Sequence, residues 1–318
     1  MLYLQEVNLK QLDISWKDTI PVISDAIQLL CADDYCQPIK PYVKFKNSTS
    51  RIIAMPAYIG GETAVAGIKW IASFPENIMN GLPRAHSVTI LNDSKTGKPI
   101  CILNSALISE IRTASLTGYV VTRYLENKHH LRNFVIGIVG FGPIGRQHLN
   151  MLDYLLGDRI EKIYLYDKKE VCLDLVPENQ RKKIVICVDW EIPFKSADIF
   201  ITATISSNGY IYGVPKSGAL LLNISLRDFK PEIMDHVHTI IVDDWDEVCR
   251  ENTDIENMHK KLGLKREQTV PITEFSQQFI FKDTESVMFN PMGMGVFDIA
   301  LAGYYYQRAL KMNVGTHL

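Results

Sequence analysis

A glycine-rich turn between a strand-like run and a helix-like segment constrains this chain more than any other feature. Residues 134–139 (FVIGIV) are apolar and mostly β-branched, which is typical of a buried parallel strand. The run 140–145 (GFGPIG) has the GxGxxG spacing, and residues 146–156 have helical character. A second strand-like run, 162–166, ends at Asp167, twenty-two residues after the last glycine. Strand, glycine turn, helix, strand and terminal acid together predict a dinucleotide-binding unit rather than an ordinary turn.

The same residues indicate how the dinucleotide binds. Glycines let the backbone approach a pyrophosphate, and the helix offers free N–H groups and the positive end of its dipole. A terminal carboxylate accepts hydrogen bonds from the adenosine ribose and repels a 2′-phosphate, so Asp167 favours NAD over NADP. Lys168 and Lys169 either weaken that preference or lie in a solvated turn. The contacts expected for NAD here are Gly140, Gly142, Pro143, Ile144, Gly145, Asp167 and Lys168.

Composition excludes several classes of protein. The chain has 318 residues with a net charge of −2, which argues against a nucleic-acid surface. Its apolar runs are too short to span a bilayer, and its N-terminus lacks the basic and apolar regions of a signal peptide. The six cysteines are scattered without a CxxC pair, which is typical of reduced thiols. We expect a cytoplasmic protein with a small-molecule ligand and neither a membrane nor a nucleic acid as partner.

No metal site is expected from the histidines and acids. The eight histidines show no metal-ligand spacing, and His129 and His130 stand together in a polar loop. The pair Asp243 and Asp244 indicates either a metal site or a cap at a strand end. We favour the cap.

The glycine turn begins late, so more than a hundred residues must form another unit first. Strands are expected within that unit at 52–56, 64–71, 87–92 and 99–103, with a polar hairpin turn at 92–98. Helices are expected at 16–32 and 105–125.

Strand-like runs continue beyond Asp167, at 183–188, 199–204, 219–224 and 239–244. Strands that alternate with helical or loop segments imply a doubly wound parallel sheet, with its ligand-binding edge at the carboxyl ends of the strands. A helix at 299–311 is expected to pack back on the first unit. The fold class is therefore α/β, a Rossmann sheet with a second α+β unit.

Three cations stand in apolar or strand-like surroundings, namely Lys40, Lys69 and Arg112. Together they suit a substrate carboxylate, because a guanidinium binds a carboxylate with two hydrogen bonds. In the alternative, Lys69 points to solvent and Arg112 pairs with Glu110 or another acid.

Asp228 follows a predicted sheet strand, at the edge where ligands bind. Near nicotinamide it can act as a general base or stabilise an iminium. In the alternative, it caps the next helix. The glycines of residues 290–295 (NPMGMG) form either a backbone wall against the cofactor or a plain loop.

These motifs, in this order, resemble the ornithine cyclodeaminase/mu-crystallin family over nearly the whole chain. They are GxKW at 67–70, LNDxxTGxPI at 91–100, SxxRTAS at 109–115, GxGxxG with its terminal acid, and the acid after the strand. The resemblance implies a split domain, residues 1–115 with 299–318, that binds substrate and forms a homodimer. It implies a Rossmann domain over residues 116–298 that holds NAD(P).

The family resemblance also implies roles for individual residues. Lys69 and Arg112 contact the substrate carboxylate, and Asp228 is the catalytic carboxylate. The family's arginine in an early PxR segment is Lys40 here, which alters one carboxylate contact. The remaining residues expected at the cofactor are Arg112, Thr113, Thr204, Ser225, Met292 and Gly293.

Within the family, the chain looks most similar to dehydrogenases that make 2,3-diaminopropionate for siderophores and antibiotics. The likeness rests on residues 37–42, 51–56, 67–71, 242–245 and 290–294. Around the acid, ornithine cyclodeaminases generally have a GGDxPGKTE-like stretch. Residues 225–232 (SLRDFKPE) keep the acid and lose the glycines, which argues against ornithine cyclisation.

This similarity implies that NAD oxidises N-(1-amino-1-carboxy-2-ethyl)-glutamate, which then yields 2-oxoglutarate and 2,3-diaminopropionate. Asp228 and Lys69 are the expected catalytic residues. The substrate has three carboxylates, so Lys40, Arg84 and Arg227 are candidates for further contacts, with a solvated surface as the alternative. Two other functions stay open: a cyclodeaminase or imine reductase acting on ornithine, lysine or a cyclic ketimine, and a non-enzymatic nucleotide-binding sensor.

Overall fold

The computed structural model describes residues 1–45, 50–62, 64–128 and 131–318. The chain forms two compact units: a first unit of Met1–Leu116 with Gly293–Leu318, and a second unit of Thr117–Met292. One boundary lies inside helix α3 (Leu107–Asn127). The other lies six residues before the expected one, so residues 293–298 belong to the first unit.

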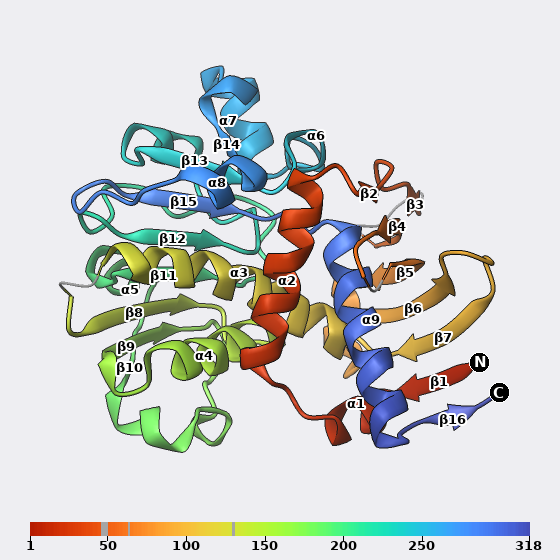
Figure 1. The fold of residues 1–318 in the computed structure, drawn as a ribbon. Helices are drawn as coiled ribbons and strands as arrows, with labels where there is room; N and C mark the ends of the chain where they lie inside the picture. Colours follow the sequence, from red (N-terminus) through yellow and green to blue (C-terminus); the bar gives the residue numbers. More distant parts are fainter. Residues whose placement is uncertain (46–49, 63, 129–130) are drawn as a thin grey trace. The chain divides into compact units, whose positions relative to one another are not determined.

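The first unit is built on a mostly antiparallel sheet with strand order β16-β1-β7-β6-β5-β4-β2, and β3 pairs with β4 (Figure 1). Only the β1–β7 pair is parallel among the strand pairs of this unit that the structure describes. The strands are β1 (Leu2–Gln5), β2 (Tyr35–Cys36), β3 (Tyr42–Lys44), β4 (Arg51–Ile59), β5 (Val65–Ser73), β6 (Ala85–Asp93), β7 (Pro99–Asn104) and β16 (Thr316–His317). The four strands expected here are present as β4 to β7.

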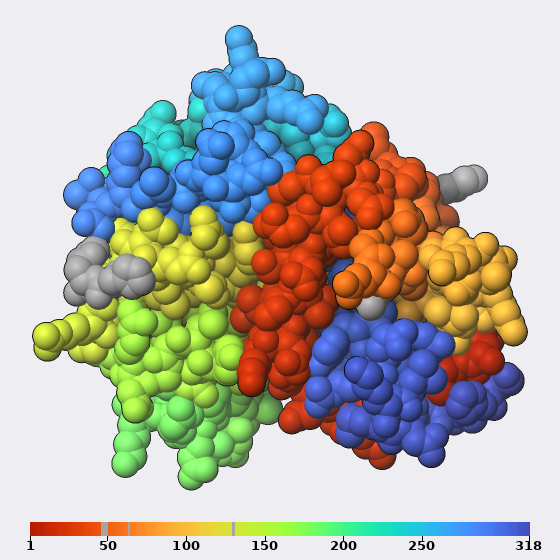
Figure 2. All heavy atoms as spheres, viewed as in Figure 1, coloured from red at the N-terminus to blue at the C-terminus, as the bar shows by residue number. Residues whose placement is uncertain are grey.

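One long helix covers a face of this sheet, and a second long helix packs against the first. Helix α9 (Gly295–Met312) contacts β4, β5 and β6, and α2 (Trp16–Cys31) packs against α9. Both views show α2, in red, beside the blue C-terminal helix (Figures 1 and 2). The short helix α1 (Glu6–Gln11) follows β1. Side chains alternate across a strand, so Lys69 is buried while its neighbour Trp70 is 43% exposed. The alternative in which Lys69 points to solvent is therefore wrong.

The second unit is a parallel eight-stranded sheet with order β10-β9-β8-β11-β12-β15-β13-β14. Its strands are β8 (Phe134–Val139), β9 (Ile160–Tyr166), β10 (Ile184–Ile186), β11 (Ile199–Thr202), β12 (Leu220–Asn223), β13 (Thr239–Val242), β14 (Val270–Pro271) and β15 (Val287–Asn290). The predicted α/β class with a doubly wound sheet is confirmed. Strand β15, which lies between β12 and β13, was not predicted.

Helices and aromatic side chains form the core around this sheet. The helices are α4 (Pro143–Leu156), α5 (Glu191–Ser196), α6 (Trp245–Val248), α7 (Asp254–Leu262) and α8 (Ile272–Gln278). Phe194 of α5, Phe200 of β11 and Phe229 are fully buried and meet edge to face. Phe229 directly follows Asp228, so this aromatic cluster packs against the segment that carries Asp228.

Three further expectations can be compared with the structure. Among the described residues, no helix is both long and apolar enough to cross a membrane. His129 and His130 lie outside the described residues, and the rest shows no group of three His, Cys, Asp or Glu side chains arranged to hold a metal. Asp244 caps α6 by accepting a hydrogen bond from the Glu247 N–H, as the strand-end cap requires.

Candidate active site

The glycine turn has the geometry of a phosphate-binding loop. Gly140 has φ +95°, and a Cβ there would lie 2.5 Å from the Ala203 carbonyl oxygen. A Cβ on Gly145 would lie 2.1 Å from the Gly140 carbonyl oxygen, so only glycine lets α4 start this close to the turn. Gly142 is the N-cap of α4, faces open space and leaves the helix without a side-chain cap. The N–H groups in the first turn of α4 are therefore open to an anion.

Asp167 stands beside this turn. One of its carboxylate oxygens accepts the Phe141 N–H at 2.6 Å, and the other accepts the Lys169 N–H at 2.8 Å. Asp167 and Lys168 line a cleft of about 650 Å³ together with Ile186, the last residue of β10, and with Cys187 and Val188, which follow it. An acid at the mouth of a partly apolar cleft suits an adenosine, with its ribose at the acid and its base among the apolar side chains.

Asp228 lies at the carboxyl ends of the central strands and is fully buried. Its carboxylate accepts hydrogen bonds from the hydroxyls of Thr204 and Ser225. The Tyr210 hydroxyl is a third partner. Lys230, rather than Asp228, is the N-cap of the next helical turn, Pro231–Asp235. The helix-cap alternative for Asp228 is therefore wrong.

The environment of Asp228 favours proton transfer. Burial raises the pKa of this carboxyl above its ordinary value, and the hydrogen bonds from Thr204 and Tyr210 offset part of that rise. A carboxylate with a raised pKa is a better proton acceptor near neutral pH. Asp228 therefore has the chemistry of a general base.

In the first unit, Lys69 and Arg112 meet at one acid. The Lys69 Nζ lies 2.8 Å from Oδ2 of Asp298, and the Arg112 Nε donates to Oδ1 at 3.1 Å. All three side chains are buried, and Asp298 has no exposed surface. Two cations against one anion leave this cluster with a net positive charge, which suits a further carboxylate. The acid partner expected for Arg112 exists, but it is Asp298 and not Glu110.

Burial and charge act in opposite directions on this cluster. The pKa of Lys69 is lowered to about 8. Burial is the main cause and the charge of Arg112 adds to it, while Asp298 acts in the opposite direction. Burial acts to raise the pKa of Asp298, but Arg112 and Lys69 outweigh it and hold that pKa below its ordinary value. Asp298 is therefore ionised across the physiological range.

Lys40 joins the cluster through the backbone. Its Nζ donates to the Gly293 carbonyl oxygen at 2.9 Å, and the side chain is 3% exposed. Gly293 has φ +86°, and a Cβ there would lie 2.8 Å from a terminal nitrogen of Arg112. Gly293 thus lies against two of the three buried cations Lys40, Lys69 and Arg112, namely Lys40 and Arg112.

The other candidate residues have varied surroundings. The Thr113 hydroxyl donates to the Ser109 carbonyl oxygen within α3. The N–H of Met292, just after β15, donates to the carboxylate of Asp243, just after β13. Arg84 is half-buried just before β6, five residues ahead of Thr89, the partner of Lys69, and hence about 16 Å from it along the strand. The Arg227 guanidinium donates to the Glu251 carbonyl oxygen at 2.8 Å.

Several residues of these clusters were not singled out from the sequence. Asp298 is an acid inside an apolar helical run (GVFDIALAG), which is a signal for a buried ion pair. Tyr210, Asn223 and Asp254 offered no comparable signal, because they lie in polar loops or at element ends where such residues are ordinary.

A parallel sheet with this glycine turn and terminal acid defines a dinucleotide-binding α/β protein with a second, mostly antiparallel unit. The chain matches the ornithine cyclodeaminase/mu-crystallin family over residues 3–313 and belongs to it.

Several proteins similar to this chain are dehydrogenases or reductases. The N-((2S)-2-amino-2-carboxyethyl)-L-glutamate dehydrogenase of Staphylococcus aureus is 32% identical, and the match covers all of this chain and 98% of that protein. The fold is similar to that of Thermococcus litoralis Δ1-pyrroline-2-carboxylate reductase in complex with NADH and L-proline, with a TM-score of 0.90 and 24% identity over both full chains. An archaeal alanine dehydrogenase dimer with bound NAD has a TM-score of 0.85 and 23% identity, and the match covers all of this chain and 98% of that one.

Proposed function

We propose that this chain is an NAD-dependent dehydrogenase that oxidises N-(2-amino-2-carboxyethyl)-L-glutamate and releases 2-oxoglutarate and 2,3-diaminopropionate. The observation that carries the proposal is the buried cluster of Lys69 and Arg112 around Asp298, whose excess positive charge suits the carboxylate of an amino-acid substrate. The 32% identity to a dehydrogenase of that substrate supports the choice. The pathway expected from the sequence, precursor supply for a siderophore or antibiotic, stays part of this proposal.

The residues of the second unit fit NAD. The open glycine turn and the free N-terminus of α4 would hold its pyrophosphate, and Asp167 would hold its adenosine ribose. When bound, NAD supplies a hydride acceptor. Thr204 and Ser225, expected at the cofactor, both bond Asp228 in the structure, so we assign them to the catalytic carboxylate as well.

The chain's own side chains then have distinct tasks in the reaction. Lys69 and Arg112 hold the glutamyl carboxylate and so orient the α-carbon, whose hydride leaves as the C–N bond becomes an imine. Asp228 takes the proton of the secondary amine or of the water that adds to the imine. Collapse of the carbinolamine breaks the C–N bond. The balance is substrate, NAD⁺ and water to 2-oxoglutarate, 2,3-diaminopropionate, NADH and a proton. Lys40, Arg84 and Arg227 stay candidates for the remaining carboxylates.

A direct assay tests this function. The purified protein is incubated with NAD and the synthetic substrate, and NADH absorbance and 2-oxoglutarate are followed together. Equal amounts of both are expected. Release of ammonia and proline from ornithine without NADH accumulation would instead identify a cyclodeaminase, and oxidation of NADH by a cyclic ketimine would identify an imine reductase. Binding of NAD without turnover of any of these substrates would favour a sensor.

We also propose that the chain works as a cytoplasmic homodimer. The outer face of the first unit's sheet carries a groove of about 360 Å³ lined by Pro38, Pro56, Tyr58 and Ile68, and Trp70 of the same strand is 43% exposed. Exposed apolar surface of this kind is typical of an interface between subunits. A related alanine dehydrogenase is a dimer. None of the six cysteines, all of which the structure describes, forms a disulfide, which agrees with a reducing compartment.

Asp167→Ala should weaken NAD binding and narrow the preference for NAD over NADP. The variant loses the ribose acceptor and releases the Phe141 N–H at the glycine turn. Each lost hydrogen bond to a charged group contributes about 1.5–3 kcal/mol, so we expect a tenfold or larger rise in the dissociation constant. Titration with NADH and with NADPH, whose reduced nicotinamide is fluorescent, measures it. The exposed acid Asp174 gives the control, Asp174→Ala, and an equal effect of both variants would contradict the assignment.

The value of kcat/KM should fall as the pH rises past about 8. The lowered pKa of Lys69 means that its charge, which binds the substrate carboxylate, is lost at a lower pH than in an ordinary lysine. Below that pH the lysine is protonated and the contact is intact. In Lys69→Arg the guanidinium keeps its charge, so its profile should stay flat over the same range. The same basic limb in both proteins would contradict this role of Lys69.

A further inference from the structure

Asp254 is a buried acid that is hydrogen-bonded to the backbone of Asp228 and Phe229. It is 1% exposed and opens α7. A single carboxylate oxygen, Oδ2, accepts three hydrogen bonds: from the Asn223 Nδ2 at 2.9 Å, and from the N–H groups of Asp228 and Phe229 at 3.1 Å each. Two of these donors are backbone groups of the segment that carries the catalytic carboxylate. Asp254 is therefore bonded to the backbone on both sides of the Asp228 Cα.

The same segment is fixed at two further points. The Asp254 N–H donates to the Leu226 carbonyl oxygen at 2.7 Å, and the Asn223 side chain accepts the Leu226 N–H at 3.1 Å. Leu226 has φ +61°, a conformation that costs a bulky residue about 1–3 kcal/mol and persists only where the surroundings impose it. These contacts impose the turn that presents Asp228.

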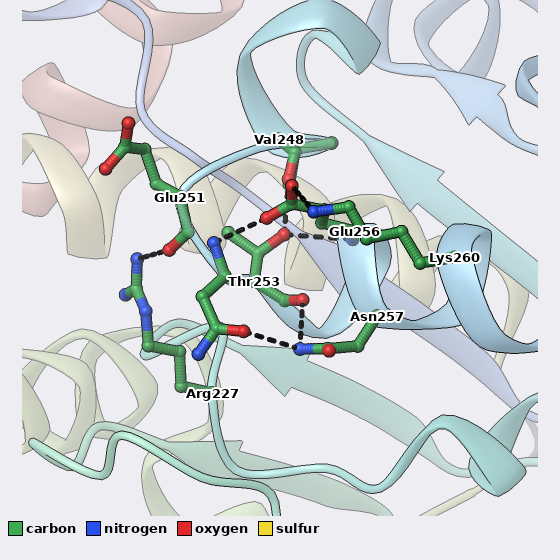
Figure 3. A network of polar contacts seen from close by, with 8 residues as sticks. Arg227, Val248, Glu251, Thr253, Glu256, Asn257 and Lys260 are labelled. Atoms are coloured by element: carbon green, nitrogen blue, oxygen red, sulfur yellow. Dashed lines mark hydrogen bonds and ion pairs between the residues drawn. The ribbon is translucent and has the colours of Figure 1, made fainter.

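The loop before α7 supplies another contact to this segment. Figure 3 shows the Arg227 guanidinium reaching the Glu251 carbonyl oxygen, at 2.8 Å, beside the first turn of α7. The loop itself is held by the helix, because the Asn252 N–H donates to Glu256 and the Asn257 side chain donates to the Thr253 carbonyl oxygen. The hydrogen-bonded start of α7 thus supports the segment that carries Asp228.

We infer that Asp254 is a positioning residue that holds the backbone of Asp228 in its reactive geometry, an inference that rests on the proposed role of Asp228. Capping of α7 does not explain Asp254. The Thr253 hydroxyl accepts the Glu256 N–H and so caps that helix itself. The Asp254 carboxylate instead points back to residues 223, 228 and 229.

A carboxyl group at this buried position has an energetic cost. The pKa of Asp254 is raised to about 7: burial is the main cause and the Asp228 carboxylate adds to it, while the Phe229 N–H and the Asn223 side chain act in the opposite direction. Two carboxylates buried this close repel each other, and an apolar residue here would avoid that repulsion. An apolar residue at this position could not accept hydrogen bonds from the three donors that share Oδ2.

Two variants test the inference, with hydrogen–deuterium exchange and kinetics as paired measurements. Asp254→Ala removes the acceptor, and Asp254→Asn keeps one acceptor oxygen. The Asp228 and Phe229 amides should lose protection in the alanine variant and regain part of it in the asparagine variant. The value of kcat should follow the same order, with a loss of about 100-fold in the alanine variant, because a small displacement of a reacting group has an effect of that size. KM and NAD affinity should change less than twofold. The exposed Asp246 gives the control, Asp246→Asn.

Each outcome has a defined meaning. Unchanged protection at residues 228 and 229 overturns the inference, and so does lost protection with an unchanged kcat. Loss of protection across the whole second unit, with NAD affinity falling beside kcat, also overturns it in favour of a general role in folding. The proposed function fails separately: a wild-type protein that makes no NADH from the substrate refutes that function, while local loss of protection in Asp254→Ala still supports the holding role.

Discussion

Asp228→Asn should reduce kcat by about 10²–10⁴-fold, the contribution of a positioned general base. Asparagine has nearly the same shape and keeps an acceptor oxygen for the Thr204 or Ser225 hydroxyl, so the surrounding strands should keep their geometry. It cannot take a proton from the amine or from water. NAD affinity should stay near the wild-type value, because Asp228 is not part of the glycine turn or of the Asp167 cleft.

The pH profile and a matched variant make this prediction sharper. Burial raises the pKa of Asp228, so the wild-type enzyme should lose kcat/KM as the pH falls and the carboxylate gains its proton. The variant should lack this acidic limb. The exposed Asp235 gives the control, Asp235→Asn, which should behave as wild type. Retained turnover in Asp228→Asn would contradict the role of Asp228 as the general base, and loss of NAD binding together with turnover would show a structural role instead.

Asp298→Ala should destabilise the protein by about 3–5 kcal/mol, the usual cost of removing one partner from a buried ion pair. The variant leaves Lys69 and Arg112 buried beside each other without their shared carboxylate. The midpoint of urea unfolding should fall accordingly. The kcat/KM should fall as well, because both cations lose the contact that orients them toward a substrate carboxylate.

A partly exposed ion pair between α2 and α9 provides the comparison. Asp18 of α2 pairs with Arg308 of α9 at 3.6 Å and also accepts a hydrogen bond from the Tyr304 hydroxyl. Surface pairs contribute about 0–1 kcal/mol, so Asp18→Ala should have little effect. Asp298→Asn should lie between the two, since it keeps the shape and loses the charge. Equal destabilisation by Asp298→Ala and Asp18→Ala would contradict the account of the buried cluster.

The second unit was largely predictable from the sequence because its signals are local. Strand β8 spans the same residues as predicted, 134–139, since a run of apolar β-branched residues bounded by glycine has few alternatives. Strand β15 was missed although it is central. Its four residues (VMFN) are too short for a periodic pattern, and only their pairing with β12 and β13 makes them a strand.

The candidate site was predictable in parts for the same reason. Lys69, Arg112 and Asp228 stand out by their neighbours in the sequence. Asp298 and Gly293 acquire their roles from residues more than 180 positions earlier in the chain, Arg112 in both cases, and no local pattern records that proximity. The positioning role of Asp254 follows only from its contacts with Asp228 and Phe229, and no spacing in the sequence predicts those contacts.

The most direct measurement is the fate of the hydrogen on the glutamyl α-carbon. The substrate is prepared with deuterium at that carbon and incubated with the enzyme and NAD. The mass of the reduced cofactor is then measured by mass spectrometry. The account predicts one deuterium in each molecule of reduced cofactor, formed in equal amount to 2-oxoglutarate. Reduced cofactor without deuterium, or 2-oxoglutarate formed without reduced cofactor, would contradict it.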